Sequence, residues 1–397
     1  MKRREFIKST AAALGAAAGA SIGGSSAAGA ESSPSIKAYR PLGRTGLKIS
    51  DISFGGGKLA SPSLVARAMD MGVNYIDTAP DYGRSEDNLG EHIKKYGRRD
   101  KLIVATKFCD YGAYGQHLAG NLPESKYIEM VEGSLRRLNT DYIDAVFVHA
   151  MGEGGHGQED RLLSENMLGA FAKLKKAGKA RFLACSSHGP NRMEELMMKA
   201  VTCGHFDYVM MAHNFMQFPK IPDVMAEAAR RGVGVVAMKT LAGAREANIS
   251  AGGQSFEHAA FAWVLKNPAV AGLVVTMSNV RDLTHYVQAS GQPFTQQSQA
   301  TLDQYMAAHS AEYCRTGCGD CLSACPEGVD VASILRYGMY FADYGEEKKA
   351  MAQYARLEKK ADACADCAGA PCQAACPYGV HVQRLMTMAH QELSFQA

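Results

Sequence analysis

Short apolar segments alternate with helical patterns along most of this chain, and no other feature limits its possible folds as strongly. Eight of the segments are typical of buried strands, and helical patterns fill the stretches between them. Alternation of this kind predicts an α/β protein whose parallel strands are covered by helices. Eight repeats over about 250 residues predict a (β/α)8 TIM barrel. The expected strands are residues 52–54, 73–76, 102–106, 143–148, 182–185, 208–211, 233–238 and 273–275.

Polar residues that could carry chemistry stand at the ends of three of these strands. Asp77 ends the second strand, Lys107 follows the third and His149 follows the fourth, while Tyr82 lies on the loop after Asp77. An Asp in a turn and a Tyr over an apolar core are each common, but a buried lysine is costly unless it is paired. Active sites of (β/α)8 barrels form at the carboxyl ends of the strands. We therefore expect these four side chains to converge in one pocket.

The motifs around these residues, YIDTAPDYG, IVATKF and DAVFVHA, resemble those of the aldo/keto reductases, and the resemblance covers roughly residues 39–286. It implies a catalytic tetrad of Asp77, Tyr82, Lys107 and His149. Tyr82 would exchange a proton with the substrate oxygen, and the Lys107 ammonium would lower the pKa of that phenol. Asp77 would keep the lysine charged and placed, and His149 would orient a carbonyl oxygen.

The same resemblance implies a nicotinamide cofactor, NADP or NAD. The candidate contacts are the polar residues after strands five to eight, which are Ser186, Asn214, Lys239, Ser278 and Asn279. This chain departs from the family pattern at several other positions. Ser187 stands where asparagine is usual, and Met210 stands where glutamine is usual. The choice between the two nicotinamides therefore stays open.

Eight of the eleven cysteines crowd into residues 314–376, in two sets of four that each end in Cys-Pro. Both sets resemble the C-x2-C-x2-C-x3-C-P run of two-cluster ferredoxins, with small insertions. We expect two [4Fe–4S] clusters, with structural zinc and disulfides as the alternatives. The sets are Cys314, Cys318, Cys321 and Cys325, and then Cys364, Cys367, Cys372 and Cys376.

Two-cluster ferredoxins exchange the fourth cysteine of each run between the clusters. By this resemblance one cluster would take Cys314, Cys318, Cys321 and Cys376, and the other would take Cys325, Cys364, Cys367 and Cys372. Between the runs, residues 331–358 show helical spacing of apolar residues. We therefore expect a small, mainly helical ferredoxin-like domain at the C-terminus, as in a subgroup of the aldo/keto reductases.

The N-terminal 30 residues are typical of an export signal. Arg3 and Arg4 precede Phe6 and an Ala/Gly run, and residues 28–30 offer a small-residue cleavage site. The paired arginines resemble the twin-arginine (Tat) signal. The Ala/Gly run is too short and too weakly apolar to span a bilayer. We expect a periplasmic protein with no stable membrane span after cleavage, and an uncleaved anchor is the alternative.

The predicted order is a signal peptide (1–30), a linker (31–38), the barrel (39–295) and the cysteine-rich domain (296–397), with a β-hairpin at 39–49 closing the bottom of the barrel. The formal net charge is +3 and no basic tract follows the N-terminus, so we expect no nucleic-acid partner.

Together these patterns predict an exported oxidoreductase that interconverts a small carbonyl compound and an alcohol. Electrons could pass through the clusters to or from a redox partner protein or a quinone-linked donor. The alternative is an electron-transfer or binding protein whose barrel is a non-catalytic docking scaffold, against which the intact tetrad weighs.

Overall fold

The computed structural model describes residues 34–112, 118, 120, 122–152, 158–216, 219–243, 249–251 and 253–394. The expected signal peptide lies outside these residues. Among the helices in the described ranges, we find none that combines the length and the apolar character needed to cross a membrane.

Eight parallel strands close into a barrel, which confirms the predicted fold class. Their order is β12-β3-β4-β5-β6-β7-β8-β9, so the last strand closes the ring against the first. β4, β5 and β6 run further than their apolar patterns indicate, so Asp77, Lys107 and His149 lie within strands. The strands are β3 (Ile52–Gly55), β4 (Tyr75–Asp77), β5 (Ile103–Phe108), β6 (Ile143–Met151), β7 (Ala180–Ser187), β8 (Tyr208–Ala212), β9 (Gly234–Met238) and β12 (Val270–Thr276).

The predicted hairpin precedes the barrel and closes its N-terminal end. Strands β1 (Tyr39–Pro41) and β2 (Lys48–Ser50) pair antiparallel. Leu42 and Ile49 are fully buried and join the side chains that fill the barrel interior, among them Tyr75 and Tyr208. The backbone N–H of Arg44 donates to the Gly232 carbonyl, 2.7 Å away, just before β9 begins.

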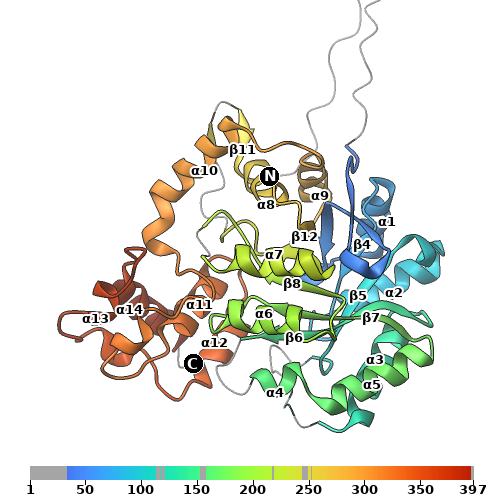
Figure 1. Cartoon of the computed structure of the whole chain (residues 1–397). Coiled ribbons are helices and arrows are strands. Elements are labelled where there is room, and N and C mark those ends of the chain that lie inside the picture. Colours follow the sequence, from blue (N-terminus) through green and yellow to red (C-terminus); the bar gives the residue numbers. More distant parts are fainter. Residues whose placement is uncertain are drawn as a thin grey trace, which may run out of the picture. The chain divides into compact units, whose positions relative to one another are not determined.

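Helices surround the strands (Figure 1). Ser61, Ser164 and Ser255 cap three of them, each accepting a hydrogen bond from a backbone N–H in the first turn. Outside the eightfold repeat lie a short helix, α4 (Gln158–Leu162), and a two-stranded antiparallel sheet of β10 (Ser250–Ala251) and β11 (Gln254–Ser255). The eight main helices are α1 (Pro62–Asp70), α2 (Ser85–Tyr96), α3 (Glu124–Arg137), α5 (Glu165–Lys176), α6 (Met193–Thr202), α7 (Ile221–Arg231), α8 (Phe256–Leu265) and α9 (Val280–Val287).

The cysteine-rich part, which we call the module, is mainly helical, as predicted. It contains α11 (Val331–Ala342), α12 (Glu347–Ala355), α13 (Pro371–Ala374) and α14 (Val382–Leu393). Its core is separate from that of the barrel and includes Ile334, Tyr354 and Met386. The single helical stretch expected at 331–358 is two helices, because residues 343–346 form a turn.

Helix α10 (Gln296–His309) falls within the range expected for the cysteine-rich domain but packs on the barrel. Tyr305 stacks on Phe256 of α8, with ring centroids 4.4 Å apart, and Leu302 joins the barrel core. The residue pattern of α10 does not reveal this partner, since an apolar stripe shows only that a face is buried.

The module docks on the end of the barrel where the strands finish. In Figure 1, α11 and α12 lie next to the barrel and α13 and α14 lie farther out. Tyr340 of α11 is hydrogen-bonded to His188 after β7, with 2.8 Å between its hydroxyl and Nδ1. Lys58, after β3, donates to the Tyr344 carbonyl at 2.8 Å. The module therefore contacts the barrel end on which active sites of this fold are built.

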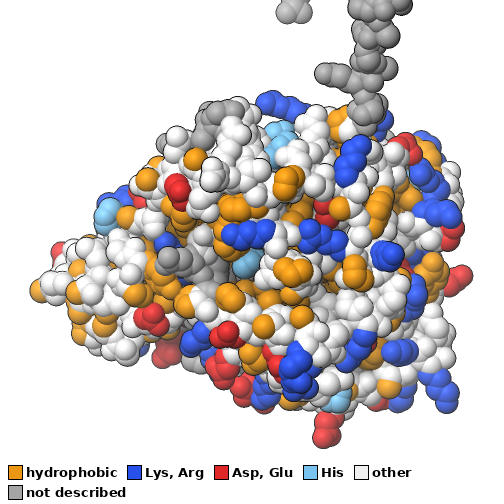
Figure 2. Space-filling model, turned by 45° about the horizontal axis from the view of Figure 1, so that its top comes forward, with side chains coloured by type: hydrophobic (Ala, Val, Ile, Leu, Met, Phe, Trp, Pro, Cys, Tyr) orange, Lys and Arg blue, Asp and Glu red, His pale blue; other side chains and the backbone are white. Residues whose placement is uncertain are grey.

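Charged side chains are dispersed on the face shown in Figure 2. Lys and Arg are interspersed with Asp and Glu there, and they form no single basic patch on that face. This is consistent with the mild net charge of the chain.

One glycine lets α2 and α3 approach closely, and replacing it tests the packing of the helical layer. A Cβ at Gly90 of α2 would lie 2.0 Å from the Arg137 carbonyl oxygen. We expect Gly90→Ala to lower the free energy of unfolding by about 2 kcal/mol or more, because backbone atoms would have to move apart. Gly133→Ala is the matched control, since its Cβ would meet only arginine side-chain ends. Denaturant unfolding measures both, and equal stability of the two variants would contradict the prediction.

Candidate functional site

A buried ion pair lies between the ends of β4 and β5. The Lys107 Nζ is 2.7 Å from Asp77 Oδ1 and donates a second hydrogen bond, also 2.7 Å, to the Thr78 carbonyl. Lys107 is 2% exposed and Asp77 is 5% exposed. Burial raises the pKa of Asp77, and the Lys107 ammonium opposes that rise. The Lys107 ammonium therefore favours the charged form of the buried Asp77 carboxylate.

Tyr82 and His149 complete the group that the sequence predicts. Lys107 Nζ lies 4.5 Å from the centroid of the Tyr82 ring. The Tyr82 and His149 rings meet edge to face, with centroids 6.0 Å apart. The structure thus brings all four candidate catalytic residues together at the C-terminal ends of β4, β5 and β6.

The backbone next to His149 is held by residues from outside β6. Arg161 donates to the His149 carbonyl at 2.6 Å, and the Ala150 N–H donates to Ser186 Oγ at 3.1 Å. Ala150 has φ of 53°, a conformation that non-glycine residues adopt at some cost. Sequence reasoning missed Arg161, because a single arginine on a short helix carries no motif.

Two further residues lie beside His149. Ligand atoms of Asp81, Cys109 and His149 all lie within 4.8 Å of one another. The His149 Nδ1 is 3.9 Å from Asp81 Oδ1. Asp81 and Cys109 are each close in sequence to a tetrad residue, so the sequence could have predicted that each lies near the tetrad. It could not have predicted that Asp81 and Cys109 lie close to each other.

The predicted nicotinamide contacts after β8 and β9 are engaged by other parts of the chain. The Asn214 amide donates to the Lys239 carbonyl at 2.9 Å and to the Tyr313 hydroxyl at 3.1 Å, and its oxygen accepts from Met216 N–H at 3.0 Å. Lys239 Nζ lies 4.9 Å and 4.2 Å from the ring centroids of Tyr340 and Tyr344.

The other three predicted contacts also have local roles or exposed positions. Ser186 binds the Ala150 N–H, as described above. Ser278 and Asn279 are exposed after β12, and Asn279 caps α9 by accepting from Asp282 N–H at 3.0 Å. A nicotinamide held by Asn214 and Lys239 does not fit this arrangement, because the polar groups of Asn214 bind the protein and tyrosines of the module lie over Lys239.

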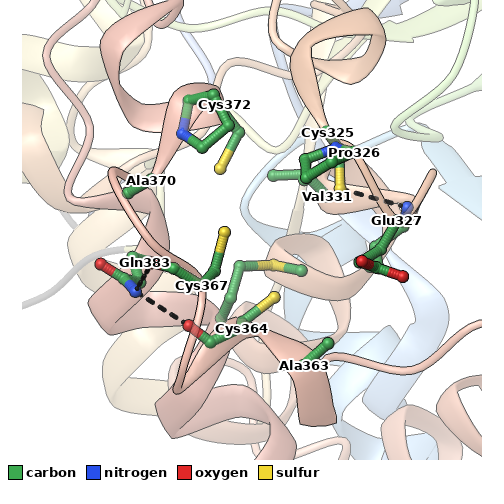
Figure 3. Close-up of a pocket in the computed structure, with 13 residues that line it drawn as sticks. Cys325, Pro326, Glu327, Val331, Ala363, Cys364, Cys367, Ala370, Cys372 and Gln383 are labelled. Carbon is green, nitrogen blue, oxygen red and sulfur yellow. Dashed lines mark hydrogen bonds between the residues drawn. The ribbon is translucent and has the colours of Figure 1, made fainter.

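The eight clustered cysteines line two separate cavities. Cys314, Cys318, Cys321 and Cys376, which we call the first set, line one cavity. Cys325, Cys364, Cys367 and Cys372, the second set, line the other. In Figure 3 the four sulfur atoms of the second set face a common space. The structure groups the cysteines as the exchange between runs predicts.

Backbone contacts hold the second set in place. Gln383 donates to the carbonyls of Cys364 and Cys367 at 3.0 and 2.9 Å (Figure 3). The Val329 N–H lies 3.4 Å from Cys325 Sγ, an arrangement that stabilises a thiolate.

The thiols themselves fit a bound cationic centre. All eleven cysteines lie in the described part of the chain, and none forms a disulfide. Burial and the neighbouring cysteines raise the pKa of Cys321 to about 12 and that of Cys364 to about 11. Four thiolates this close therefore need a metal to neutralise them, which suits iron–sulfur ligation.

Comparisons with known proteins agree with both parts. Residues 59–250 match the model of the aldo/keto reductase family, and residues 306–388 match the model of the 4Fe-4S dicluster domain. The chain is 36% identical over 172 residues to the uncharacterized oxidoreductase YqkF of Bacillus subtilis, a stretch of 41% of this chain and 52% of that protein. The chain thus spans about half the length of this relative.

Two other proteins match over a larger share of the chain. L-galactose dehydrogenase of Arabidopsis thaliana is 27% identical over 287 residues, which is 63% of this chain and 87% of that protein. The solved structure of the aldo-keto reductase AKR11C1 of Bacillus halodurans shares the fold, with a TM-score of 0.54 and 23% identity over 67% of this chain and 95% of that one. By these matches the barrel resembles the aldo/keto reductases over residues 59–250, and the C-terminal module resembles 4Fe-4S dicluster domains over residues 306–388.

Proposed function

We propose that this protein is an exported oxidoreductase that interconverts a carbonyl and an alcohol, with electrons relayed through two [4Fe–4S] clusters. The observation that carries the proposal is the buried Lys107–Asp77 pair, whose ammonium lies 4.5 Å from the Tyr82 ring beside His149. A structural role alone does not require a buried charge next to a phenol.

The four residues divide the proton chemistry among them. Tyr82 gives a proton to the carbonyl oxygen as an alcohol forms, and it takes the proton back in the reverse direction. The Lys107 ammonium stabilises the phenolate that remains, and Asp77 holds that ammonium in place. His149 donates a hydrogen bond to the substrate oxygen and orients it.

The electrons have a source other than a dissociable nicotinamide. Reduction of a carbonyl to an alcohol takes two electrons and two protons. Tyr82 supplies the proton on the oxygen, and the hydrogen on the carbon would arrive as a hydride from a tightly held nicotinamide, which two electrons and a solvent proton would regenerate. Two [4Fe–4S] clusters, when bound, supply two one-electron carriers.

The paired arginines near the N-terminus support export by the Tat pathway to the periplasm. That pathway suits a protein that must acquire its clusters before it leaves the cytoplasm. A redox partner protein or a quinone-linked donor would then supply the electrons outside.

Replacing Tyr82 tests whether the barrel is catalytic. We expect Tyr82→Phe to lower kcat by about 10²–10⁴, because proton transfer from a placed side chain contributes that much. The assay follows oxidation of reduced methyl viologen by a panel of small aldehydes and ketones. Tyr96→Phe, at the exposed end of α2, is the control. Unchanged turnover by a folded Tyr82→Phe protein would favour the docking scaffold instead.

Removing a cluster ligand tests the relay. We expect Cys321→Ser to lose iron and to reduce viologen-dependent turnover to the level of Tyr82→Phe. Cys203→Ser, outside both sets, should keep full iron content and activity. Iron analysis and the viologen assay measure both. Rapid oxidation of freely added NADPH by cluster-free protein would rule out the relay.

Replacing the paired arginines tests export. We expect Arg3→Lys combined with Arg4→Lys to leave most of the protein in the cytoplasm, because the pathway reads the arginine pair. Lys2→Gln is the control and should be exported normally. Cell fractionation followed by immunoblotting measures the distribution, and periplasmic accumulation of the double variant would refute the proposal.

A further inference from the structure

Two buried arginines flank the first cysteine set, and neither has a carboxylate partner in the part of the chain that the structure describes. Arg336 is 4% exposed and Arg315 is 5% exposed. A buried charge without a counter-ion costs several kcal/mol. Something of opposite charge must therefore compensate the two guanidinium groups.

Arg336 projects from α11 towards Cys314. The two residues line one cavity. The guanidinium donates to the Thr316 hydroxyl and to the Met339 sulfur, the latter at 3.1 Å, and its central carbon lies 5.9 Å from the Tyr313 ring centroid. All three partners are uncharged, so none of them balances its charge.

Arg315 lies on the other side of Cys314. It donates to the Ser310 carbonyl at 2.8 Å and to Ser310 Oγ at 2.7 Å. It also lies 4.6 Å from the Tyr378 ring centroid and lines the same cavity as the four cysteines of the first set. Its contacts are likewise uncharged.

The second set has no such arginines among the described residues that line its cavity. The residues that line its cavity include Glu327, and neither Arg nor Lys is among those that the structure describes there. The two cysteine sets therefore sit in different electrostatic environments, although the ligand chemistry of both is the same.

The first set also adjoins the barrel. Cys318 lines a groove together with Glu194 and Met198 of α6. Tyr313, next to Cys314, accepts a hydrogen bond from Asn214 at the end of β8.

A [4Fe–4S] cluster with four thiolate ligands is an anion and gains one more negative charge when it is reduced. Nearby positive charge favours the reduced form, and net charge is one of the factors that set the potential of such clusters. We propose that Arg336 and Arg315 raise the reduction potential of the first-set cluster above that of the second-set cluster, so that an electron entering the module settles next to the barrel.

The proposal rests on the two-cluster relay described above. A low-potential one-electron carrier outside the protein reduces the module. In the internal step, one electron leaves the second-set cluster, which returns to its oxidised state, and reduces the first-set cluster. No bond forms or breaks in this step and no proton is needed.

The test is a redox titration of the cluster-loaded protein, followed by electron paramagnetic resonance. We expect Arg336→Met to shift the higher-potential cluster to a more negative potential. If the ratio of reduced first-set cluster to reduced second-set cluster changes tenfold, the difference between their reduction potentials has changed by about 59 mV, as for any one-electron couple. The reduction potential of the lower-potential cluster should not change. Arg336→Lys keeps the charge and should restore most of the potential.

Arg384→Met is the matched control. Arg384 lines the same cavity as Arg336 but is exposed to solvent and paired with Glu312 at 2.7 Å, so its loss should shift neither potential appreciably. If Arg336→Met does not load clusters, Arg315→Gln provides the same measurement from the other side of Cys314.

The possible outcomes distinguish a failure of this proposal from a failure of the proposed function. Unchanged potentials in a fully loaded Arg336→Met protein, or an equal shift of both clusters, would overturn the role of the arginines and leave the relay intact. Wild-type protein with iron for fewer than two clusters would overturn both.

Discussion

The salt bridge between Lys107 and Asp77 is the interaction on which the site depends, because an unpaired charge is costly at this depth. Removing one partner of such a pair typically costs about 3–5 kcal/mol. The pair fixes the register in which β4 and β5 present their last residues, with Asp77 opposite Ala105. That register in turn sets the positions of the Tyr82 loop and of His149 on β6. A stability requirement and a catalytic arrangement are thus met by the same two side chains.

The module also determines which groups surround the C-terminal end of the barrel. The rings of Tyr340 and Tyr344 lie near the Lys239 ammonium at the end of β9. Tyr340 is also hydrogen-bonded to His188 after β7, and Tyr313 to Asn214 after β8. Residues of the module therefore contact the ends of all three strands. In an aldo/keto reductase barrel without such a module, these strand ends would be open to a ligand. Here their polar groups hold a dicluster domain in place, which ties the proposed electron source to the chemistry of the barrel.

Much of this arrangement could be predicted from the sequence, because strand alternation, the tetrad motifs and the Cys-Pro runs are local signals. Even the division of the cysteines between two cavities agrees with what the resemblance to two-cluster ferredoxins implies. Contacts between distant segments could not be predicted. Nothing near Tyr340 indicates His188 as its partner. The buried face of α10 includes Ser298, Thr301 and His309, so its sequence does not indicate that it packs on α8. Asn214 and Lys239 were expected to face a cofactor, and their contacts with the module depend on tertiary structure that no motif encodes.

Helix α11 carries Arg336 and Tyr340 four residues apart, which is one helical turn and about 6 Å along its axis. The first side chain lies beside the first cysteine set, and the second forms part of the wall of the barrel mouth. Because one helix carries both side chains, their spacing is set by helix geometry and not by the loops around them. A substitution that tilts α11 would therefore displace the surroundings of the first cysteine set and the contact with His188 together.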